Sequence, residues 1–383
     1  MKQIKAQWVT QSETQDICAM LVNAGFQAYF VGGCVRNALL GAPISDIDLA
    51  TDALPEQVVG LAKRAGFKPV PTGVEHGTVT VVVRGHAFEI TTYRKDIDTD
   101  GRRATVSFSK SIEEDAHRRD FTMNALFATP DGTIVDPLGG LNDLLARRVR
   151  FIDDPGARIR EDYLRILRFF RFHAWYGDLD RGLDREGLAA VAAHCDGIET
   201  LSRERVGQEM KKLLGAADPA ASVAAMEHAG ALAHVLPGAT SRILPVLIHF
   251  EHETGARPDS IVRLASLGGC EQKERLRLSR SEARNLSVLQ AHAGTSCGLA
   301  ELAYRHGPDM ALGIMLLNCA MLETNPPSNF KDDIAMGVSA KFPVSARDLM
   351  PDLKGKALGG RLDELEKKWI ASGFTLTREE LLK

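Results

Sequence analysis

The sequence lacks the features that mark secreted, disulfide-bonded and membrane-spanning proteins. Its first residues, MKQIKAQWVTQSETQD, contain no apolar segment, so we expect no signal peptide. The six cysteines are scattered and include no C-x-x-C pair, which argues against a structural zinc site or a disulfide framework and favours a reducing cytoplasm. The apolar stretch 311–322 is shorter than the roughly 20 residues that a membrane helix needs, so we expect no membrane association.

A general excess of basic residues is also missing. Lys and Arg number 47 against 50 for Asp and Glu, so the formal net charge is −3 and a uniformly basic surface is excluded. Binding of a nucleic acid would therefore depend on local basic clusters. Residues 147–171 form such a cluster, with eight Arg against four acids.

The 383 residues are 44% hydrophobic and 25% charged, which is an ordinary composition for a globular protein. At about 100–200 residues per domain, this length predicts two to four domains. Helical and extended patterns alternate at first, with helical spacing at 12–24, 34–40 and 55–65 and strand patterns at 27–33, 46–51, 77–83 and 87–94. From about residue 141 all patterns are helical. We therefore expect an α+β protein, a mixed sheet with helices followed by helical segments. The expected domains are a head (1–140), a neck (141–218), a body (219–325) and a tail (326–383).

Asp46 and Asp48 on one expected strand are candidate metal ligands. Side chains at positions i and i+2 of a strand point to the same face, and Mg²⁺ is commonly held by one or two carboxylates together with substrate phosphates. Glu89, between Phe88 and Ile90 on a later strand, is a candidate third acid. The alternative interpretation is that all three are partly solvated acids of no chemical role.

Gly32 and Gly33 lie where an expected strand turns into a helix. A glycine turn lets backbone N–H groups approach a triphosphate, and the helix N-terminus behind it favours anions. Arg36, on the first turn of that helix, can add a charge-assisted hydrogen bond to the same phosphates. These residues are candidate nucleotide-binding residues.

The glycine turn, the D-x-D strand and the later acid between two apolar residues together resemble the nucleotidyltransferase superfamily that includes DNA polymerase β. GGCVRNALLG (32–41) followed by SDIDLAT (45–51) is similar to the first motif of class II tRNA CCA-adding enzymes and bacterial poly(A) polymerases. The resemblance implies a polymerase β-like head in which Asp46 and Asp48 bind two Mg²⁺ ions and Glu89 is a third catalytic acid. One departure is Asn37, where the family usually has Asp.

Four later segments resemble further motifs of this family, in order: RRDFTMNAL (118–126), DPLGGLNDL (136–144), EDYLRILRFFR (161–171) and ERVGQEMKKLL (204–214). The first implies sugar and phosphate contacts by Arg119, Asp120 and Asn124. The second implies a hinge, and the last an acid–base brace in the neck.

The segment 161–171 carries the expected selection of the nucleotide base. Its spacing predicts a helix with Asp162, Arg165, Arg168 and Arg171 along one face, which in an arbitrary protein would be a solvated ion-pair face. The resemblance implies instead that Asp162 accepts a hydrogen bond from the exocyclic amine of cytosine or adenine while Arg165 donates to the ring. Arg168 and Arg171 would also bind the nucleotide.

The resemblance therefore implies a cytoplasmic, template-independent nucleotidyltransferase that adds or repairs the 3′-terminal CCA of tRNA from CTP and ATP, releasing pyrophosphate, with the tail contacting tRNA. TGVEHGTVTV (72–81) and the mixed charges of the last residues favour this interpretation over a poly(A) polymerase. The long segment 94–118, with Asp100-Gly101-Arg102-Arg103, favours a complete CCA over CC or A alone. An inactive RNA-binding protein and a small-molecule nucleotidyltransferase are the remaining alternatives.

Overall fold

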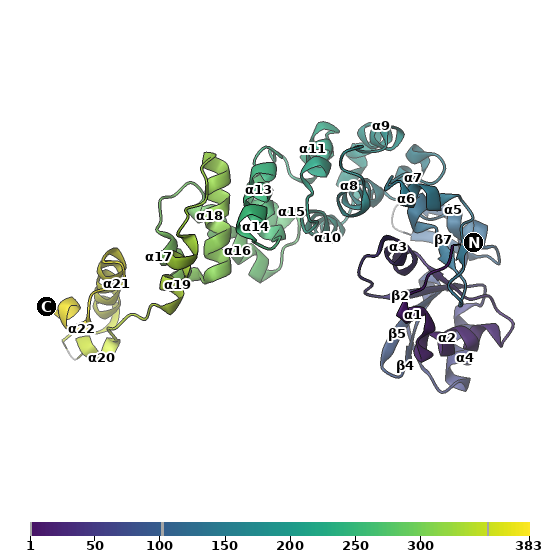
Figure 1. Cartoon of the computed structure of the whole chain (residues 1–383), viewed down its shortest axis with the longest axis horizontal. Helices are drawn as coiled ribbons and strands as arrows, with labels where there is room; N and C mark the ends of the chain where they lie inside the picture. The colour runs from purple at the N-terminus through teal and green to yellow at the C-terminus, as the bar shows by residue number, and fades with distance from the viewer. Residues whose placement is uncertain (1, 101–102, 351) are drawn as a thin grey trace. The chain divides into compact units, whose positions relative to one another are not determined.

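The structure is a computed structural model that describes residues 2–100, 103–350 and 352–383 (Figure 1). The chain divides into two compact units, one of Met1–Thr240 with Gly269–Arg277 and one of Ser241–Gly268 with Leu278–Lys383. The first unit holds a mixed seven-stranded sheet and the helices that follow it, so the expected α+β class and mixed-sheet head are confirmed. The division into four domains stays a prediction.

The sheet of the head has the strand order β3-β4-β5-β2-β1-β8-β9, in which only β2 and β5 are parallel. Its strands are β1 (Tyr29–Val31), β2 (Ile47–Thr51), β3 (Lys68–Gly73), β4 (Thr78–Val83), β5 (His86–Thr92), β8 (Phe127–Ala128) and β9 (Ile134–Val135). Alternation in β4 sends Val79, Val81 and Val83 into the core, as the period of two predicts. Arg84 and Gly85 both have positive φ and close a hairpin between the antiparallel strands β4 and β5.

Glycine and proline residues mark several ends of the helices in the head. These helices are α1 (Gln7–Thr10), α2 (Ser12–Val22), α3 (Gly33–Leu40), α4 (Pro55–Arg64) and α5 (Ile112–His117), with the short 3₁₀ helices η1 (Val74–His76) and η2 (Thr122–Asn124). Helix α3 lies between Gly32 and Gly41, which have φ of 70° and 67°, values that favour glycine. It packs against β1 and β2, whereas α4 packs against β3, β4 and β5.

Strand β3 and a separate ribbon were not predicted. The ribbon consists of β6 (Arg94–Asp100) and β7 (Arg103–Phe108), in the segment expected to be a loop. Of the residues singled out there, Gly101 and Arg102 lie outside the described residues. The motif 72–81 spans three elements, because η1 lies between β3 and β4.

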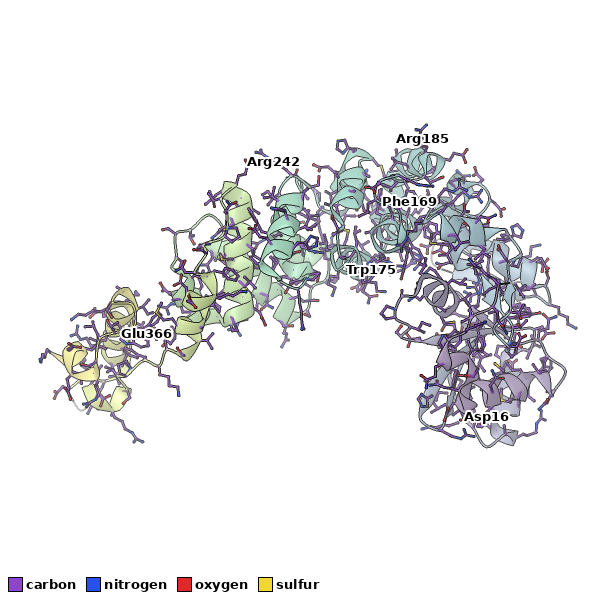
Figure 2. The ribbon with its side chains drawn as sticks, viewed as in Figure 1. Asp16, Phe169, Trp175, Arg185, Arg242 and Glu366 are labelled. Atoms are coloured by element: carbon purple, nitrogen blue, oxygen red, sulfur yellow. The ribbon has the colours of Figure 1, made fainter. Side chains whose placement is uncertain are left out.

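The helical part of the first unit covers the expected neck and pieces of the expected body, and it is arranged around α8, which is buried on several sides. Its elements are α6 (Gly140–Leu145), α7 (Pro155–Glu161), α8 (Leu164–Tyr176), α9 (Arg185–His194), η3 (Cys195–Thr200), α10 (Arg203–Leu214), α11 (Ala220–His228), α12 (Ala231–Val235) and α15 (Gln272–Arg275). Phe169 of α8 (Figure 2) packs against Phe151 at 5.2 Å between ring centroids, and Phe151 packs against Phe121 at 5.0 Å. These fully buried rings join the neck to the segment that follows α5.

The expected continuous helix over 161–171 is interrupted at its start. Helix α7 ends at Glu161, and Asp162 is extended with φ −154° and ψ 104°. Helix α8 begins at Leu164, whose N–H donates to Asp162 Oδ1 at 3.1 Å. An aspartate competes well for backbone N–H groups at helix ends, so it separates the two helices instead of continuing one.

The second of the paired glycines in the expected hinge, Gly140, serves close packing, whereas Gly139 has a positive φ of 69° and open space around it. Asp136 accepts hydrogen bonds from the N–H groups of Gly140 at 2.8 Å and Leu141 at 3.0 Å, which ties down the start of α6. A Cβ added at Gly140 would lie 2.1 Å from the carbonyl oxygen of Thr122. Glycine is therefore required at position 140 by the backbone of η2.

Gly140→Ala is expected to lower the free energy of unfolding by about 1–3 kcal/mol, because backbone atoms must move to admit the methyl group. The matched control is Gly60→Ala in α4, where a Cβ meets nothing within 4 Å. Helix propensity predicts that this control is up to about 1 kcal/mol more stable than the parent. Urea unfolding of both variants measures the difference, and equal stability of G140A and the parent would contradict the packing argument.

The second unit is helical. It contains α13 (Leu244–Thr254), α14 (Ser260–Leu267), α16 (Arg280–His292), α17 (Leu299–His306), α18 (Pro308–Leu322), α19 (Phe330–Ser339), α20 (Ala346–Leu349), α21 (Gly355–Ala371) and α22 (Arg378–Leu382). A buried ion pair joins Arg263 to Glu251, with Arg263 Nη2 2.6 Å from Glu251 Oε2. Within the described ranges, none of the helices, α18 included, is long and apolar enough to cross a membrane.

Candidate active site

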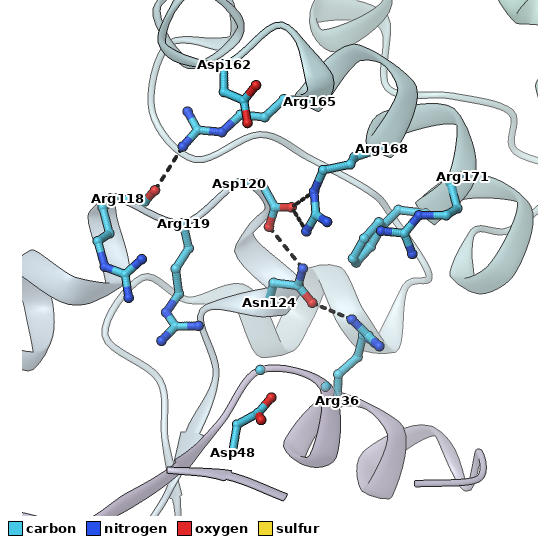
Figure 3. Close-up of a pocket in the computed structure, with 13 residues that line it drawn as sticks. Arg36, Asp48, Arg118, Arg119, Asp120, Asn124, Asp162, Arg165, Arg168 and Arg171 are labelled. Atoms are coloured by element: carbon cyan, nitrogen blue, oxygen red, sulfur yellow. Dashed lines mark hydrogen bonds and ion pairs between the residues drawn. The ribbon is translucent and has the colours of Figure 1, made fainter. Parts of the chain in front are cut away.

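A cavity of about 450 Å³ in the first unit collects most of the predicted site residues (Figure 3). Eleven of the thirteen line it: Gly32, Gly33, Arg36, Asp48, Arg119, Asp120, Asn124, Asp162, Arg165, Arg168 and Arg171. Asp46 and Glu89 do not line the cavity, whereas Arg118 and Phe172, which were not predicted, do. Head residues form one side and residues of α8 the other, and the lining combines six arginines with three acids, Asp48, Asp120 and Asp162.

The acids of the head cluster around Asp48. Asp46 is exposed immediately before β2, and Glu89 on β5 is the parallel register partner of Asp48 on β2. Register partners of neighbouring strands present their side chains on the same face of the sheet. Burial, followed by the negative charges of Glu89 and Asp46, raises the pKa of Asp48 to about 6. The negative charges of Glu89 and Asp46 are therefore close enough to Asp48 to disfavour its ionisation.

The chemistry of these oxygen donors suits a divalent cation, because a positive charge would offset both the burial of the Asp48 carboxylate and its repulsion by Glu89 and Asp46, the two causes of its raised pKa. In the part of the chain that the structure describes, no group of three or more His, Cys, Asp or Glu side chains is close enough to hold a metal ion. Binding of two Mg²⁺ ions by Asp46 and Asp48 thus stays a prediction, as does the catalytic role of Glu89.

The glycine turn lies between two guanidinium groups. Gly32 has φ 70° and ψ −120°, and a Cβ at this position would lie 3.6 Å from Arg119 Nη1. A Cβ at Gly33 would lie 3.9 Å from Arg36 Nη2. The N-terminus of α3 is thus flanked by two positive charges, an arrangement that suits a polyphosphate, and the predicted nucleotide binding by these residues stays a prediction.

A chain of hydrogen bonds crosses the cavity from α3 to α8 (Figure 3). Arg36 Nη1 donates to Asn124 Oδ1, Asn124 Nδ2 donates to Asp120 Oδ1 at 2.9 Å, and Arg168 Nε donates to Asp120 Oδ2 at 2.8 Å. Burial opposes ionisation of Asp120, yet the charge of Arg168 and the hydrogen bond from Asn124 lower its pKa to about 2. Asp120 is therefore an ionised carboxylate that positions Arg168, and its proposed contact with a ribose hydroxyl stays a prediction.

Aromatic rings allow the basic groups to approach one another. The guanidinium carbon of Arg36 lies 3.9 Å from the ring centroid of Tyr176 and 5.1 Å from that of Phe172. The guanidinium carbons of Arg168 and Arg171 lie 5.3 Å and 4.6 Å from the Phe172 centroid. The electron-rich face of an aromatic ring attracts cations, so Phe172 partly offsets the repulsion between the three arginines. Phe172 directly follows Arg171, a predicted site residue, and this position is the signal by which the sequence could have identified it.

Asp162 and Arg165 both reach the cavity, but each already has protein partners. Asp162 Oδ2 accepts from Arg205 Nη2 at 2.6 Å, across from α10. Arg165 Nη1 donates to the carbonyl of Arg158 at 2.7 Å, and Nη2 donates to the carbonyl of Arg118 at 3.0 Å. These bonds hold both side chains in one orientation at the edge of the cavity.

Helix α10 supplies the acid–base brace predicted for the fifth motif. Arg205 contacts Asp162, and Glu209, one turn further along α10, accepts a hydrogen bond from Arg171 Nε at 2.5 Å. Glu209 is 5% exposed, so the pair is shielded from solvent. Arg205 was not among the predicted site residues, because nothing local in the sequence pairs it with an acid 43 positions earlier.

Arg118 and Arg119 share one buried acid. Asp115 of α5 accepts from Arg118 Nε at 2.7 Å and from Arg119 Nη2 at 2.8 Å. Burial opposes ionisation of Asp115, but the charges of Arg119 and Arg118 hold its pKa below the usual value. Asp115 therefore presents two adjacent guanidinium groups to the cavity.

Asn37, the departure from the family pattern, has two functions in the structure. Its Oδ1 accepts hydrogen bonds from Arg36 at 3.1 Å and 2.9 Å, and its Nδ2 donates to the carbonyl of Pro43 at 2.7 Å. An aspartate could accept from Arg36 but could not donate to Pro43. The asparagine thus connects Arg36 to the loop that leads into Asp46.

Comparisons with known proteins show which family the chain resembles. Residues 28–150 match the family model of the poly A polymerase head domain, and residues 182–243 match the model of a probable RNA and SrmB- binding site of polymerase A. The mouse mitochondrial CCA tRNA nucleotidyltransferase 1 is 31% identical over 371 residues, which cover 92% of this chain and 84% of the relative. The CCA-adding enzyme of Geobacillus thermodenitrificans is 41% identical over 224 residues, 58% of this chain and 54% of the relative.

A solved structure has the same fold over almost the whole chain. The crystal structure of the Bacillus stearothermophilus CCA-adding enzyme in complex with CTP is 28% identical, with a TM-score of 0.70, and the match covers 94% of this chain and 92% of that one. Similarity therefore extends through the helical segments after residue 215, where the sequence motifs end.

Proposed function

We propose that this chain, which belongs to the family of CCA-adding tRNA nucleotidyltransferases, adds or repairs the 3′-terminal CCA of tRNA from CTP and ATP. The observation that carries the proposal is the basic cavity in which a glycine turn, the Asp48 carboxylate and the Asp162–Arg165 pair meet. This combination suits a nucleoside triphosphate that is held at its phosphates and inspected at its base.

The reaction joins the RNA 3′-hydroxyl to the α-phosphate of CTP or ATP. The new P–O bond forms as the bond between the α-phosphorus and the bridging oxygen breaks, and pyrophosphate leaves. Enzymes of this family generally use divalent metal ions. Two Mg²⁺ ions held by Asp46 and Asp48 would supply charge neutralisation at the attacking and leaving oxygens. Glu89, beside Asp48, adds a third negative charge at this place.

The triphosphate would bind along the glycine turn. The backbone N–H groups at the start of α3 and the guanidinium groups of Arg36 and Arg119 face this place. Arg168 and Arg171 approach from α8, held by Asp120 and Glu209. Because these acids are part of the protein, the arginines keep their positions before the nucleotide arrives, which lowers the entropic cost of binding.

Asp162 and Arg165 would recognise the base through hydrogen bonds. The Asp162 carboxylate has lone pairs beyond the two used by Leu164 and Arg205, and can accept from the exocyclic amine of cytosine or adenine. Arg165 has five N–H donors, of which those not bonded to backbone carbonyls or Glu161 can reach a base. Uracil and guanine offer an acceptor where cytosine and adenine offer the amine, so an acid at this place disfavours them.

Label transfer from α-labelled CTP and then ATP onto tRNA that lacks its 3′ CCA tests the proposal. We expect two C and one A to be added, with Mg²⁺ required and EDTA inhibitory. Extended A addition to any RNA would support a poly(A) polymerase, the second candidate that the match of residues 28–150 favours. Addition of CC or A alone would indicate partial specificity, and RNA binding without transfer would indicate an inactive protein.

A cytoplasmic location is part of the proposal. It is supported by cysteines that are free in the structure, among them the buried Cys18, Cys34 and Cys319. Free thiols are typical of reducing compartments. Fractionation of the source cells with an antibody against the chain tests it.

A further inference from the structure

Trp175 at the end of α8 is an exposed indole held in a fixed orientation (Figure 2). The residue is 49% exposed, and its Nε1–H donates to the carbonyl oxygen of Lys212 at 2.7 Å. Lys212 lies in the last turn of α10, where carbonyl groups have no partner within the helix. The ring is therefore tied along its polar edge while much of its apolar surface stays in contact with solvent.

The position of Trp175 continues the row of α8 side chains that line the cavity. Trp175 follows Arg171 by four residues and Arg168 by seven, so the three share one face of the helix. Arg168 and Arg171 line the cavity, and Trp175 lies about 6 Å along the helix axis beyond Arg171 and about 10 Å beyond Arg168. A strand that leaves the cavity along this face would meet the indole next.

Two lysines lie in the last turn of α10, the turn whose carbonyl oxygen accepts the hydrogen bond from the indole. Lys212 is 60% exposed at its side chain, with Nζ 3.9 Å from Glu209, the acid that pairs with Arg171. Lys211 is its neighbour in the last turn of α10. An aromatic face beside basic side chains is the combination by which proteins hold single-stranded nucleic acid without reading its sequence.

We propose that Trp175 is a stacking platform for the unpaired base at the 3′ end of the RNA acceptor, an inference that rests on the proposed function. The base of the incoming nucleotide is excluded as occupant by distance. Arg165 and Trp175 are ten residues apart on α8, about 15 Å along its axis, so one base cannot contact both. The ligand is instead a second, unpaired base, and the reaction has one at the end of the RNA that is extended.

Binding of two RNAs tests the platform: a tRNA lacking its CCA, and the same tRNA with an abasic 3′-terminal nucleotide. Stacking of one base contributes enough that Trp175→Ala is expected to weaken binding of the intact RNA about five- to a hundredfold. Trp175→Phe should retain most of the affinity. The abasic RNA should bind the parent and W175A equally, and the KM for CTP should be the same in both.

Intrinsic fluorescence supplies a second readout. Binding of the intact RNA should quench tryptophan emission in the parent, and the quenching should be absent in W175F, because stacked bases quench an indole directly. Val22→Ala is the matched control, since Val22 is 48% exposed on α2 and belongs to no part of the site.

Equal losses for intact and abasic RNA in W175A, or no loss at all, would overturn the inference. Either result can occur in a protein that still transfers label from CTP to tRNA, so it leaves the proposed function untouched. Conversely, absence of label transfer in the parent would refute the proposed function, whatever the binding measurements show.

Discussion

Asp48→Ala and, separately, Asp46→Ala are expected to reduce kcat for CTP addition by at least about a thousandfold, or about 4 kcal/mol. Each change removes a carboxylate that would hold a metal ion where charge develops on the attacking and leaving oxygens. Asp48 gives the stronger test of the metal site, because its side chain lines the cavity and lies close enough to Glu89 and Asp46 for their charges to raise its pKa. Single-turnover rates at saturating CTP and tRNA measure the effect.

Two further variants make this result interpretable. Asp48→Asn keeps the shape of the side chain and removes its charge, so it should lose nearly as much as the alanine variant if charge is the cause. Glu56→Ala, an exposed acid in the first turn of α4, should turn over like the parent. Binding of tRNA should persist in the Asp48 variants, since it depends on the helical segments. Near-normal turnover in Asp48→Ala would refute the assignment of the metal site.

Asp162→Ala is expected to lower the preference for CTP over UTP, measured as a ratio of kcat/KM, by roughly ten- to a hundredfold. A hydrogen bond to a charged acceptor contributes about 1.5–3 kcal/mol, and only cytosine and adenine use this acceptor. Asp162→Asn should admit UTP more readily than Asp162→Ala does, because the amide can donate to the uracil oxygen. Competition between paired nucleotides on a tRNA that ends before CCA measures the ratio.

The contact between Arg205 and Asp162 makes Arg205→Ala a useful companion variant. Arg205 holds Asp162 Oδ2, so its removal should lower the same ratio by a smaller factor while leaving the acceptor in place. Asp180→Ala, an exposed acid in the loop after α8, is the control and should preserve the ratio. If Asp162 only makes a solvated ion pair, its alanine variant changes stability slightly and the C:U ratio stays where it was.

Local patterns predicted most of the head correctly. The period of two in β4, the glycines around α3 and the proline at the start of α4 place these elements within a residue or two. Such signals depend only on neighbouring residues, because side-chain alternation, positive φ and the missing N–H of proline act within one turn or strand. Strand β3 escaped because its segment contains Pro69 and Pro71 and shows no alternation, and β6 escaped because it is almost entirely polar. Strand β7 does alternate, at Ala104, Val106 and Phe108, and this was a signal that could have found it.

The order of the motifs along the chain is enough to identify most of the residues that line the cavity. Eleven of thirteen predicted residues line it, since a cluster of glycines, acids and arginines in a characteristic order marks a site even when the distances are unknown. What the order does not show is which charges neutralise each other. Helical spacing predicts Asp162 on one helix with Arg165, yet Asp162 is extended and pairs with Arg205.

By itself, the sequence determined the class of the fold and most of the residues of the cavity. Only the tertiary structure decided that Asp120 orients Arg168, that Glu209 orients Arg171, and that Trp175 is tied to the last turn of α10. The physical reason is that a periodic pattern specifies which face of an element is buried, but not which residue of another element lies opposite. Which residues lie opposite each other depends on how the helices cross and on short links between them. One such link is Asp162–Tyr163, where the extended conformation of Asp162 changes the direction of the chain between α7 and α8.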